Sequence, residues 1–412
     1  MKQQIDTLMQ QNHAAALWVS GAANHNPSMV YLTGGAHLTN ADLFYLPGQI
    51  PYLCHGLMER DEAKKTGYQL ISYANYDLNA LLRQTGGDPL EAAALRYQQI
   101  LQDIGLTRGK VLLYGMREFG PFYSILRRLE HLLPGLEFAG DVDDAILLEA
   151  RSTKDEAELG RIRGMANVTV EVVGNTLDFL TSHTAKDETL VKKDGSPLTI
   201  GDVKQQINLW LAQKDAENPE DTIFAIGRDA GVPHSSGTPS DPIRLGQTIV
   251  YDIFPCEKGG GYFYDFTRTW CLGYASDEVQ QIYEQVLQTY TTLVSELKAG
   301  DNPNLYQQRT CELFEAMGHE TVRTNPRVTH GYVHGVGHGV GLDVHEKPWF
   351  SRADDPSNNL QPGSVFTMEP GLYYPEKGYG IRLEDTYFVS QEGNIAKFAE
   401  FPLDLVIPMG GS

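Results

Sequence analysis

The first 150 residues alternate short apolar runs with longer amphipathic stretches. The stretches DPLEAAALRYQQILQDIG and FGPFYSILRRLEHLL have the spacing of helices, and the apolar runs between and around them are ALWVSG, MVYLTG, DLFYLP, KVLLYG and DAILLEA. Apolar runs of this length are typical of buried strands. Strands that alternate with helices indicate a small α/β domain in this part of the chain.

A new helical pattern begins just after residue 150. Ser152 and Thr153 precede Asp155 and Glu156 by three residues, which is the spacing of a helix-start box. Apolar residues then recur at helical spacing, at Leu159, Ile162, Ala166, Val170, Val173 and Leu177. We therefore predict two domains, 1–150 and 151–412.

The second predicted domain contains what look like two copies of one unit. A second long helix is expected to begin after Ser276 as its N-cap and to end at Gly300. Each long helix is followed by a shorter helical pattern, near 200–212 and near 304–318, and then by a glycine-rich, strand-like stretch. If the two copies are related, a site between them should draw ligands from both.

Composition and charge exclude several classes of function. The formal net charge is -20, which argues against nucleic acid and anionic membranes as partners, because both require a clustered basic surface. No apolar run approaches the roughly 18 residues of a membrane span. The first 21 residues do not have the pattern of a signal peptide, and the cysteines Cys54, Cys256, Cys271 and Cys311 form no C-x-x-C pair. We expect a cytoplasmic protein with buried thiols.

Residues 330–345, HGYVHGVGHGVGLDVH, contain four histidines. On a helix His330, His334 and His338 would lie on one face, but the five glycines between 331 and 341 make a helix unfavourable. The segment is therefore predicted to be loop or strand, with its backbone close to another element or at positive φ. Its G-x-G-x-G-x-G spacing does not match the nucleotide-binding loops.

Two carboxylates are expected to face each other in the first copy. The stretch TIVYDIFPCEKGGGYFYDFTRTW is predicted to be a hairpin, and Lys258 and Gly259 as its turn residues would place Asp252 directly opposite Asp265. Like charges at such positions destabilise a hairpin unless a cation compensates them.

The second copy repeats this arrangement. Glu369 and Glu384 are fifteen residues apart, and a hairpin turning at Glu376 and Lys377 would set them face to face, with Arg382 on the same face to orient a carboxylate. One acidic pair across a hairpin is most often solvated surface. Two pairs at corresponding positions, embedded in apolar strands, instead indicate a site for two divalent ions, with Mn²⁺, Co²⁺ and Zn²⁺ all possible. Such a site is suited to metal-assisted hydrolysis.

Taken together, these motifs resemble the pita-bread metallopeptidases, the family of methionine aminopeptidase, aminopeptidase P and prolidase. The matching segments, in family order, are AGVPHSSG, VYDIFP with YFYDFTRT, HGVGHGVGLDVHE, FTMEPGLY and GIRLEDT. The resemblance implies an α+β protein whose C-terminal pita-bread domain has pseudo-twofold halves. The VYLTGG segment resembles the creatinase-type α/β domain that precedes it in the Xaa-Pro branch.

The resemblance also implies roles for individual residues. The five metal ligands fall on Asp252, Asp265, His338, Glu369 and Glu384. Residues that contact substrate or stabilise the tetrahedral intermediate fall on His334 and His345, a further active-site histidine on His234, and residues lining the site on Tyr373 and Arg382. His330 has no counterpart, and we expect a structural role for it.

Two departures from the family pattern are visible. The aspartates are thirteen residues apart, two more than is usual, which should move the turn and keep both side chains on one face. Ile253 and Phe254 stand where a glycine is usual, which should change the local backbone but not the ligand.

The reaction implied is hydrolysis of an N-terminal Xaa-Pro bond with two divalent ions as cofactor, Mn²⁺ being the first expectation. Glu369 is the candidate proton shuttle, and His345 would stabilise the oxyanion. Three alternatives stay open: a strict Xaa-Pro dipeptidase, a metal-independent creatinase-like C–N hydrolase and a non-enzymatic binding relative. The partners expected are a peptide with proline second and another copy of the chain in a homodimer.

Overall fold

A computed structural model describes residues 4–351 and 355–410 of the chain. The chain divides into two compact units, one formed by residues 1–151 with 259–261 and the other by residues 152–258 with 262–412. Each unit has its own sheets and its own buried apolar residues.

The first unit is built on a six-stranded mixed sheet in the order β4-β3-β2-β1-β5-β6. The central strand β1 pairs antiparallel with β2 and parallel with β5. The strands are β1 Ala14–Gly21, β2 Ala41–Tyr45, β3 Tyr52–His55, β4 Gln69–Ser72, β5 Gly109–Gly115 and β6 Leu136–Ala139. The helices are α1 Gln4–Gln11, α2 Pro27–Thr33, α3 Arg60–Lys64, α4 Leu78–Gln84, α5 Pro89–Asp103, α6 Phe119–Leu132 and α7 Ala145–Ala150.

Two apolar runs that we interpreted as strands are helices. MVYLTG belongs to α2, which has Asn26 as its N-cap, proline in its first turn and Gly34 in the left-handed conformation at its end. DAILLEA forms α7. A short apolar run does not by itself distinguish a buried strand from a buried helix, and the caps around residues 26–34 decide for helix.

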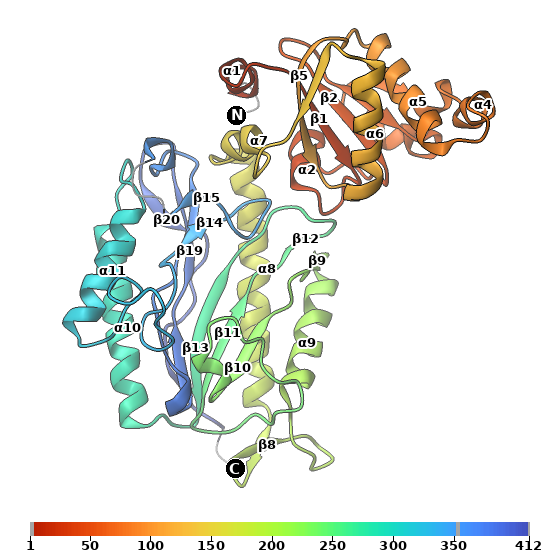
Figure 1. The fold of residues 1–412 in the computed structure, drawn as a ribbon. Helices are drawn as coiled ribbons and strands as arrows, with labels where there is room; N and C mark the ends of the chain where they lie inside the picture. Colours follow the sequence, from red (N-terminus) through yellow and green to blue (C-terminus); the bar gives the residue numbers. More distant parts are fainter. Residues whose placement is uncertain (1–3, 352–354, 411–412) are drawn as a thin grey trace. The chain divides into compact units, whose positions relative to one another are not determined.

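The second unit contains four long helices and two main sheets (Figure 1). The helices are α8 Glu156–Thr181, α9 Ile200–Gln213, α10 Asp277–Glu296 and α11 Asn304–Ala316. One sheet has the order β10-β11-β13-β21, with strands Ile223–Ile226, Thr248–Ile253, Phe266–Leu272 and Val406–Ile407. The other has the order β15-β14-β16-β19-β20, with strands Glu346–Trp349, His338–Gly339, Val365–Met368, Asp385–Val389 and Ile395–Lys397.

Three smaller two-stranded sheets complete this unit. They pair β7 with β8, β9 with β12 and β17 with β18, over Thr184–Lys186, Thr189–Val191, Ala216–Glu217, Cys256–Glu257, Gly371–Tyr374 and Tyr379–Arg382. The order of helix, helix and sheet thus occurs twice, as the sequence pattern predicted.

The starts of the two longest helices differ in how well they were predicted. Ser276 caps α10 as expected, because its side chain accepts a hydrogen bond from the Val279 amide, but α10 ends at Glu296 rather than at Gly300. The cap of α8 is Asp155, which forms a capping box with Glu158, so our assignment of the start to Ser152 and Thr153 was wrong by a few residues. Residues 153 and 154 instead pair with residues 363 and 364 of the chain.

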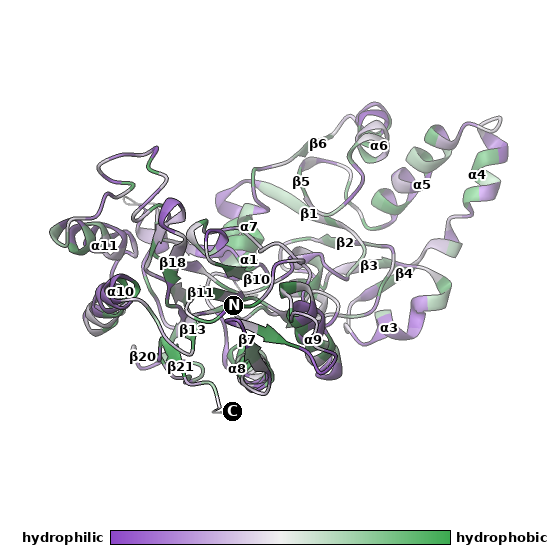
Figure 2. Ribbon diagram, turned by 90° about the horizontal axis from the view of Figure 1, so that it is seen from below, coloured by the Kyte–Doolittle hydropathy of each residue, from purple (hydrophilic) through white to green (hydrophobic). Residues whose placement is uncertain are grey.

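Hydrophobic side chains hold the second unit together around its strands. Figure 2 shows green colour on strands such as β18 and β21, whereas α10 and α11 carry purple stretches. The apolar stripe of α10, with Val286 and Leu293 fully buried, packs into one cluster with residues of β16 and β18. Burial of these faces is the main stabilising contribution to the unit. Among the described residues no helix is both long and apolar enough to cross a membrane.

Candidate active site

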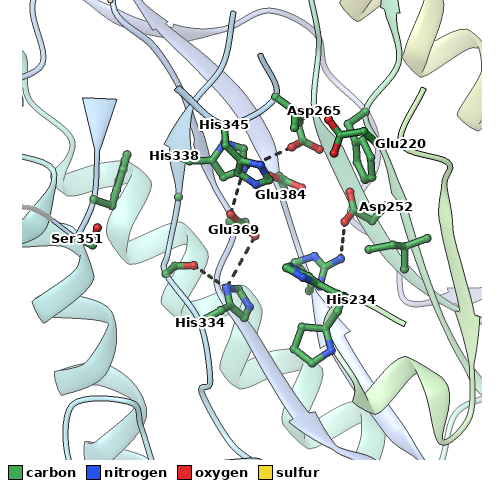
Figure 3. Close-up of a pocket in the computed structure, with 18 of the residues that line it drawn as sticks. Glu220, His234, Asp252, Asp265, His334, His338, His345, Ser351, Glu369 and Glu384 are labelled. Carbon is green, nitrogen blue, oxygen red and sulfur yellow. Dashed lines mark hydrogen bonds and ion pairs between the residues drawn. The ribbon is translucent and has the colours of Figure 1, made fainter. Parts of the chain in front are cut away.

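A cavity of about 720 Å³ collects the predicted site residues in the second unit (Figure 3). Side chains from both copies of the helix, helix and sheet pattern line it. Those singled out from the sequence are His234, Asp252, Asp265, His334, His338, His345, Glu369, Arg382 and Glu384. Tyr373 is buried next to them and bonds to two of them.

The first hairpin has a different register from the one predicted. Asp252 pairs with Thr267 rather than with Asp265. The central turn residues of that register are Gly259 and Gly260, which both have positive φ, at 87° and 81°. A tight hairpin turn favours positive φ at both central positions, and a pair of glycines meets this need better than Lys258 with Gly259. Because the register moved by two residues, Asp265 still shares a face with Asp252, diagonally displaced.

The second hairpin has the predicted register. Gly371 pairs with Arg382 and Met368 with Asp385, so Glu369 and Glu384 face each other between these two pairs. The turn is a short 3₁₀ helix over Pro375–Lys377 that ends at Gly378.

The histidine segment contributes its ligand through a very short strand. His338 begins β14, and the segment is loop and strand as expected. A Cβ atom on Gly337 would lie 2.3 Å from the Thr367 carbonyl oxygen, and one on Gly339 would lie 2.1 Å from the Lys347 backbone. Glycine is therefore required on either side of His338 because the backbone packs directly against β15 and β16.

Three of the predicted ligands lie within reach of one metal ion. Asp265, His338 and Glu384 each offer a ligand atom, and these atoms are within 4.8 Å of one another. The His338 Nε2 atom is 3.5 Å from an Asp265 oxygen and 3.4 Å from a Glu369 oxygen. Four carboxylates and one imidazole thus converge on one region of the cavity, as Figure 3 shows.

The hydrogen bonding of these carboxylates fits a bound cation. Asp252, Asp265 and Glu384 each have one buried oxygen without a hydrogen-bond partner. A buried oxygen left without a donor costs free energy, on the order of 1–3 kcal/mol or more for a charged group. Bound divalent ions would supply the missing partners of these oxygens, and the mixed oxygen and imidazole donor set suits such ions.

The pKa values of these side chains also show that the site does not stabilise several ionised carboxylates when no cation is bound. Burial raises the pKa of Glu384 to about 8, with the charge of Asp252 adding to the shift. Burial and neighbouring carboxylates also raise the pKa of Asp265 and Glu369 well above the usual range. Burial lowers the pKa of His338 to about 3, so that its imidazole is neutral and able to bind a metal. A cation in the site would reverse the shifts of the carboxyl groups.

Arg382 and Tyr373 form a second layer behind the carboxylates. The Arg382 guanidinium donates to Asp252 at 2.5 Å and to the Tyr373 hydroxyl at 2.7 Å. The Tyr373 hydroxyl is also 2.8 Å from His334 Nε2. The second half of the unit therefore orients a carboxylate of the first half.

His345 lies against His338, with ring centroids 4.2 Å apart. The next residue, Glu346, is completely buried and accepts a hydrogen bond at 2.6 Å from Lys154, which is equally buried. Its other oxygen accepts from the Leu342 and Asp343 amides. This ion pair holds the loop that carries His345.

His330 is placed apart from these residues. Its side chain is 56% exposed, lies 3.3 Å from Glu320 and does not line the cavity.

Three features of the site were not predicted from the sequence. Thr267 donates to Glu384 at 2.6 Å, Lys154 pairs with Glu346, and Glu220 lines the cavity. The two-residue spacing of Asp265 and Thr267 on one strand face was the available signal for Thr267. No local pattern pointed to Lys154, because its partner is 192 residues away in the sequence, and none singled out Glu220.

Comparison with known proteins agrees with this geometry. The chain is 30% identical to an Xaa-Pro dipeptidase of Pyrococcus furiosus over 198 residues, which cover 47% of this chain and 51% of that protein. An X-Pro aminopeptidase structure from Thermotoga maritima superposes with a TM-score of 0.74 at 22% identity and covers 97% of this chain and all of that chain. A dipeptidase structure from Pyrococcus horikoshii superposes with a TM-score of 0.73 at 21% identity, covering 98% and 99%.

These structural neighbours identify the second unit as a pita-bread fold preceded by an N-terminal domain, as the sequence motifs predicted. The family description Metallopeptidase family M24 matches residues 163–391, which is more than half of the chain. The cavity, its carboxylates and its histidine all lie within or beside that range. The chain therefore belongs to metallopeptidase family M24.

Proposed function

We propose that this metallopeptidase hydrolyses the peptide bond between the first residue of a peptide and a proline at the second position. The observation that supports the proposal is that five side chains able to bind metal converge in the cavity, beside His334, His345 and Arg382, and that three of their oxygens have no hydrogen-bond partner. Relatives named for Xaa-Pro peptides support the choice of substrate.

In this proposal Asp252, Asp265, His338, Glu369 and Glu384 hold two divalent ions. When bound, such ions lower the pKa of water and polarise a carbonyl oxygen. We infer Mn²⁺ as the first candidate, with Co²⁺ and Zn²⁺ as alternatives, because the ligand set is mostly carboxylate.

The side chains of the chain handle the protons and the substrate. Glu369 takes the proton of the attacking water and delivers it to the proline nitrogen as the C–N bond breaks. Burial lowers the pKa of His345, so its neutral imidazole donates a hydrogen bond to the oxyanion. His234 and His334 flank the substrate from the two halves of the unit.

We assign the selectivity for proline to the side chains that contact Tyr373. A proline nitrogen carries no hydrogen, and its ring fixes φ near -65°. A selective site therefore needs a shaped pocket rather than a backbone acceptor. His334 and Arg382 line the cavity and supply rigid walls, because the buried Tyr373 hydroxyl holds both of them through contacts of 2.8 Å or less.

The test compares Ala-Pro with Ala-Ala and Ala-Pro-Ala with Ala-Ala-Ala, using protein that has been loaded with metal. Faster cleavage of the proline peptides supports the proposal. Equal rates would leave a broader aminopeptidase, and no cleavage of any peptide would favour the creatinase-like or the binding alternative. A strict dipeptidase, which the names of two relatives favour, would cleave Ala-Pro and not Ala-Pro-Ala.

The oligomer and the compartment also remain proposals. We propose a homodimer in the cytoplasm, with the first unit as a creatinase-type domain and the second as the catalytic domain. Light scattering of the purified full chain would measure the oligomeric state directly.

A further inference from the structure

One carboxylate of the cavity has no place in the ligand set. Glu220 lines the cavity together with Asp252 and Asp265 and is drawn on the same side of it in Figure 3. The Glu220 side chain is exposed, whereas Asp252, Asp265 and Glu384 are only 8%, 4% and 1% exposed. Glu220 therefore stands nearer to solvent than the carboxylates that are expected to bind metal.

The segment that carries Glu220 is anchored on both sides. Before it, the Asn218 side chain donates to the Thr222 hydroxyl at 2.8 Å. After it, Asp221 accepts from Lys204 Nζ at 2.5 Å, and the same Nζ donates to the Ser236 carbonyl at 3.2 Å. Asp221 has a φ of 65°, an uncommon conformation for a residue other than glycine. These contacts fix the backbone around Glu220 while its own carboxylate lines the cavity.

Within the described part of the cavity wall, no lysine or arginine is available to neutralise Glu220. Among the described residues that line the cavity, Arg382 is the only one with a permanent positive charge, and it is bonded to Asp252 and Tyr373.

We propose that Glu220 determines specificity by binding the positively charged side chain of a lysine or arginine at the first position of the substrate. This inference rests on the proposed function. The α-ammonium group is two bonds from the scissile carbonyl and must lie deep, among the buried carboxylates. A lysine or arginine side chain extends several bonds farther and reaches a more exposed carboxylate. The formal net charge of -20 also favours the approach of cationic peptides.

The experiment measures kcat/KM for Lys-Pro-Ala and norleucine-Pro-Ala, whose first side chains have similar length and differ in charge. The proteins compared are the wild type, Glu220→Gln, Glu220→Lys and the control Glu392→Gln. Glu392 lies outside the cavity, in an exposed turn, and its substitution changes the net charge by the same amount as Glu220→Gln.

We expect the wild type to prefer the lysine peptide by about three- to fivefold, in line with a partly exposed ion pair. Glu220→Gln should remove the preference and Glu220→Lys should invert it, whereas Glu392→Gln should keep it. High salt should weaken the preference of the wild type.

An unchanged preference in folded Glu220→Gln would overturn the inference, as would an equal loss for both peptides. Equal loss would assign Glu220 to the α-ammonium group or to the loop structure. Hydrolysis of norleucine-Pro-Ala by the wild type tests the proposed function separately. If this peptide is cleaved but Glu220→Gln keeps the lysine preference, only the inference about Glu220 fails.

Discussion

Buried carboxylates in the first unit and in the cavity of the second unit differ in how their charge is compensated. Asp42 in the first unit is fully buried and accepts hydrogen bonds or an ion pair from Trp18, Ser20, Tyr73, Tyr97 and Arg117. The Trp18 and Tyr97 contacts are 2.8 and 2.9 Å long. Charge-assisted hydrogen bonds of this kind stabilise a buried carboxylate without any ion.

In the second unit the buried carboxylates face one another. Asp265 and Glu384 each keep one oxygen without a partner, and both have raised pKa values because burial and neighbouring negative charges disfavour ionisation. Asp385, the next residue along the chain from Glu384, is fully buried as well but accepts from Arg268 at 2.8 Å and from Tyr290. The number of hydrogen-bond donors around a carboxylate, rather than its burial, distinguishes structural carboxylates from those with an oxygen left to bind a cation.

Removing the imidazole ligand should have the largest effect on activity. His338→Ala should lower kcat/KM by more than the roughly 10- to 100-fold that is typical of changes around the ligands. The folded fraction should change little, because a loop ligand contributes to the site more than to the core. His330→Ala is the matched control, since His330 belongs to the same segment and is exposed. Near wild-type turnover and metal content in His338→Ala would contradict the ligand assignment.

A pair of Asp→Asn variants tests the contrast between the units directly. Asp42→Asn should lower the free energy of unfolding by roughly 2–4 kcal/mol, because charge-assisted bonds are lost, and should leave the metal content unchanged. Asp265→Asn should leave the metal-free protein as stable as the wild type or more stable by about 1 kcal/mol, because a repulsive charge is removed. Chelator-treated Asp265→Asn should not regain activity with Mn²⁺ or Co²⁺, unlike the wild type.

Denaturant unfolding and metal analysis on the same samples measure both effects. If Asp265→Asn destabilised the metal-free protein as much as Asp42→Asn does, the two centres would not differ as described.

A smaller effect on activity is expected from changing Tyr373, which is not itself a metal ligand. Tyr373→Phe removes the hydroxyl that accepts from Arg382 and bonds to His334, while the apolar ring remains. We expect kcat/KM for Xaa-Pro peptides to fall about tenfold or more, with both metals retained. Loss of metal in this variant would show that Tyr373 supports Asp252 rather than the substrate.

The smallest expected effect is the change with pH in the free energy of unfolding of the metal-free protein. The pKa of Glu384 is raised to about 8 by burial, so the folded state holds a proton that the unfolded state has released above about pH 4.5. Stability should therefore fall as pH rises through this window. Burial lowers the pKa of His334 and His338 to about 3, which makes stability rise with pH, but only up to about 6.5.

Between pH 6.5 and 8 the histidines no longer contribute, and the raised pKa of the buried carboxyl groups alone makes stability fall with pH. Thermal unfolding of the metal-free protein should then show a decrease on the order of 1 kcal/mol. Adding Mn²⁺ should abolish the decrease, because a cation favours the ionised carboxylates. A flat profile in the chelated protein would argue against the repulsion between these groups.

Much of the site could be predicted from the sequence because alternation along a strand is a local property. Asp252 and Asp265 are thirteen residues apart and Glu369 and Glu384 fifteen, and an odd separation in a hairpin keeps both side chains on one face in any register that moves by two. The prediction that the two carboxylates share one face of the hairpin therefore held, although the predicted register of the first hairpin was wrong by two residues. The cap at Ser276 and the shorter helices α9 and α11 were also set by local patterns.

The sequence by itself determined the alternation of faces, the helix periodicity and the set of residues able to bind metal. Only the tertiary structure decided the register at Gly259 and Gly260 and the contacts between distant segments. Arg382 reaches Asp252 across 130 residues, and Lys154 reaches Glu346 across 192. Whether a buried oxygen finds a donor depends on which distant side chain packs against it, and no local pattern encodes that packing.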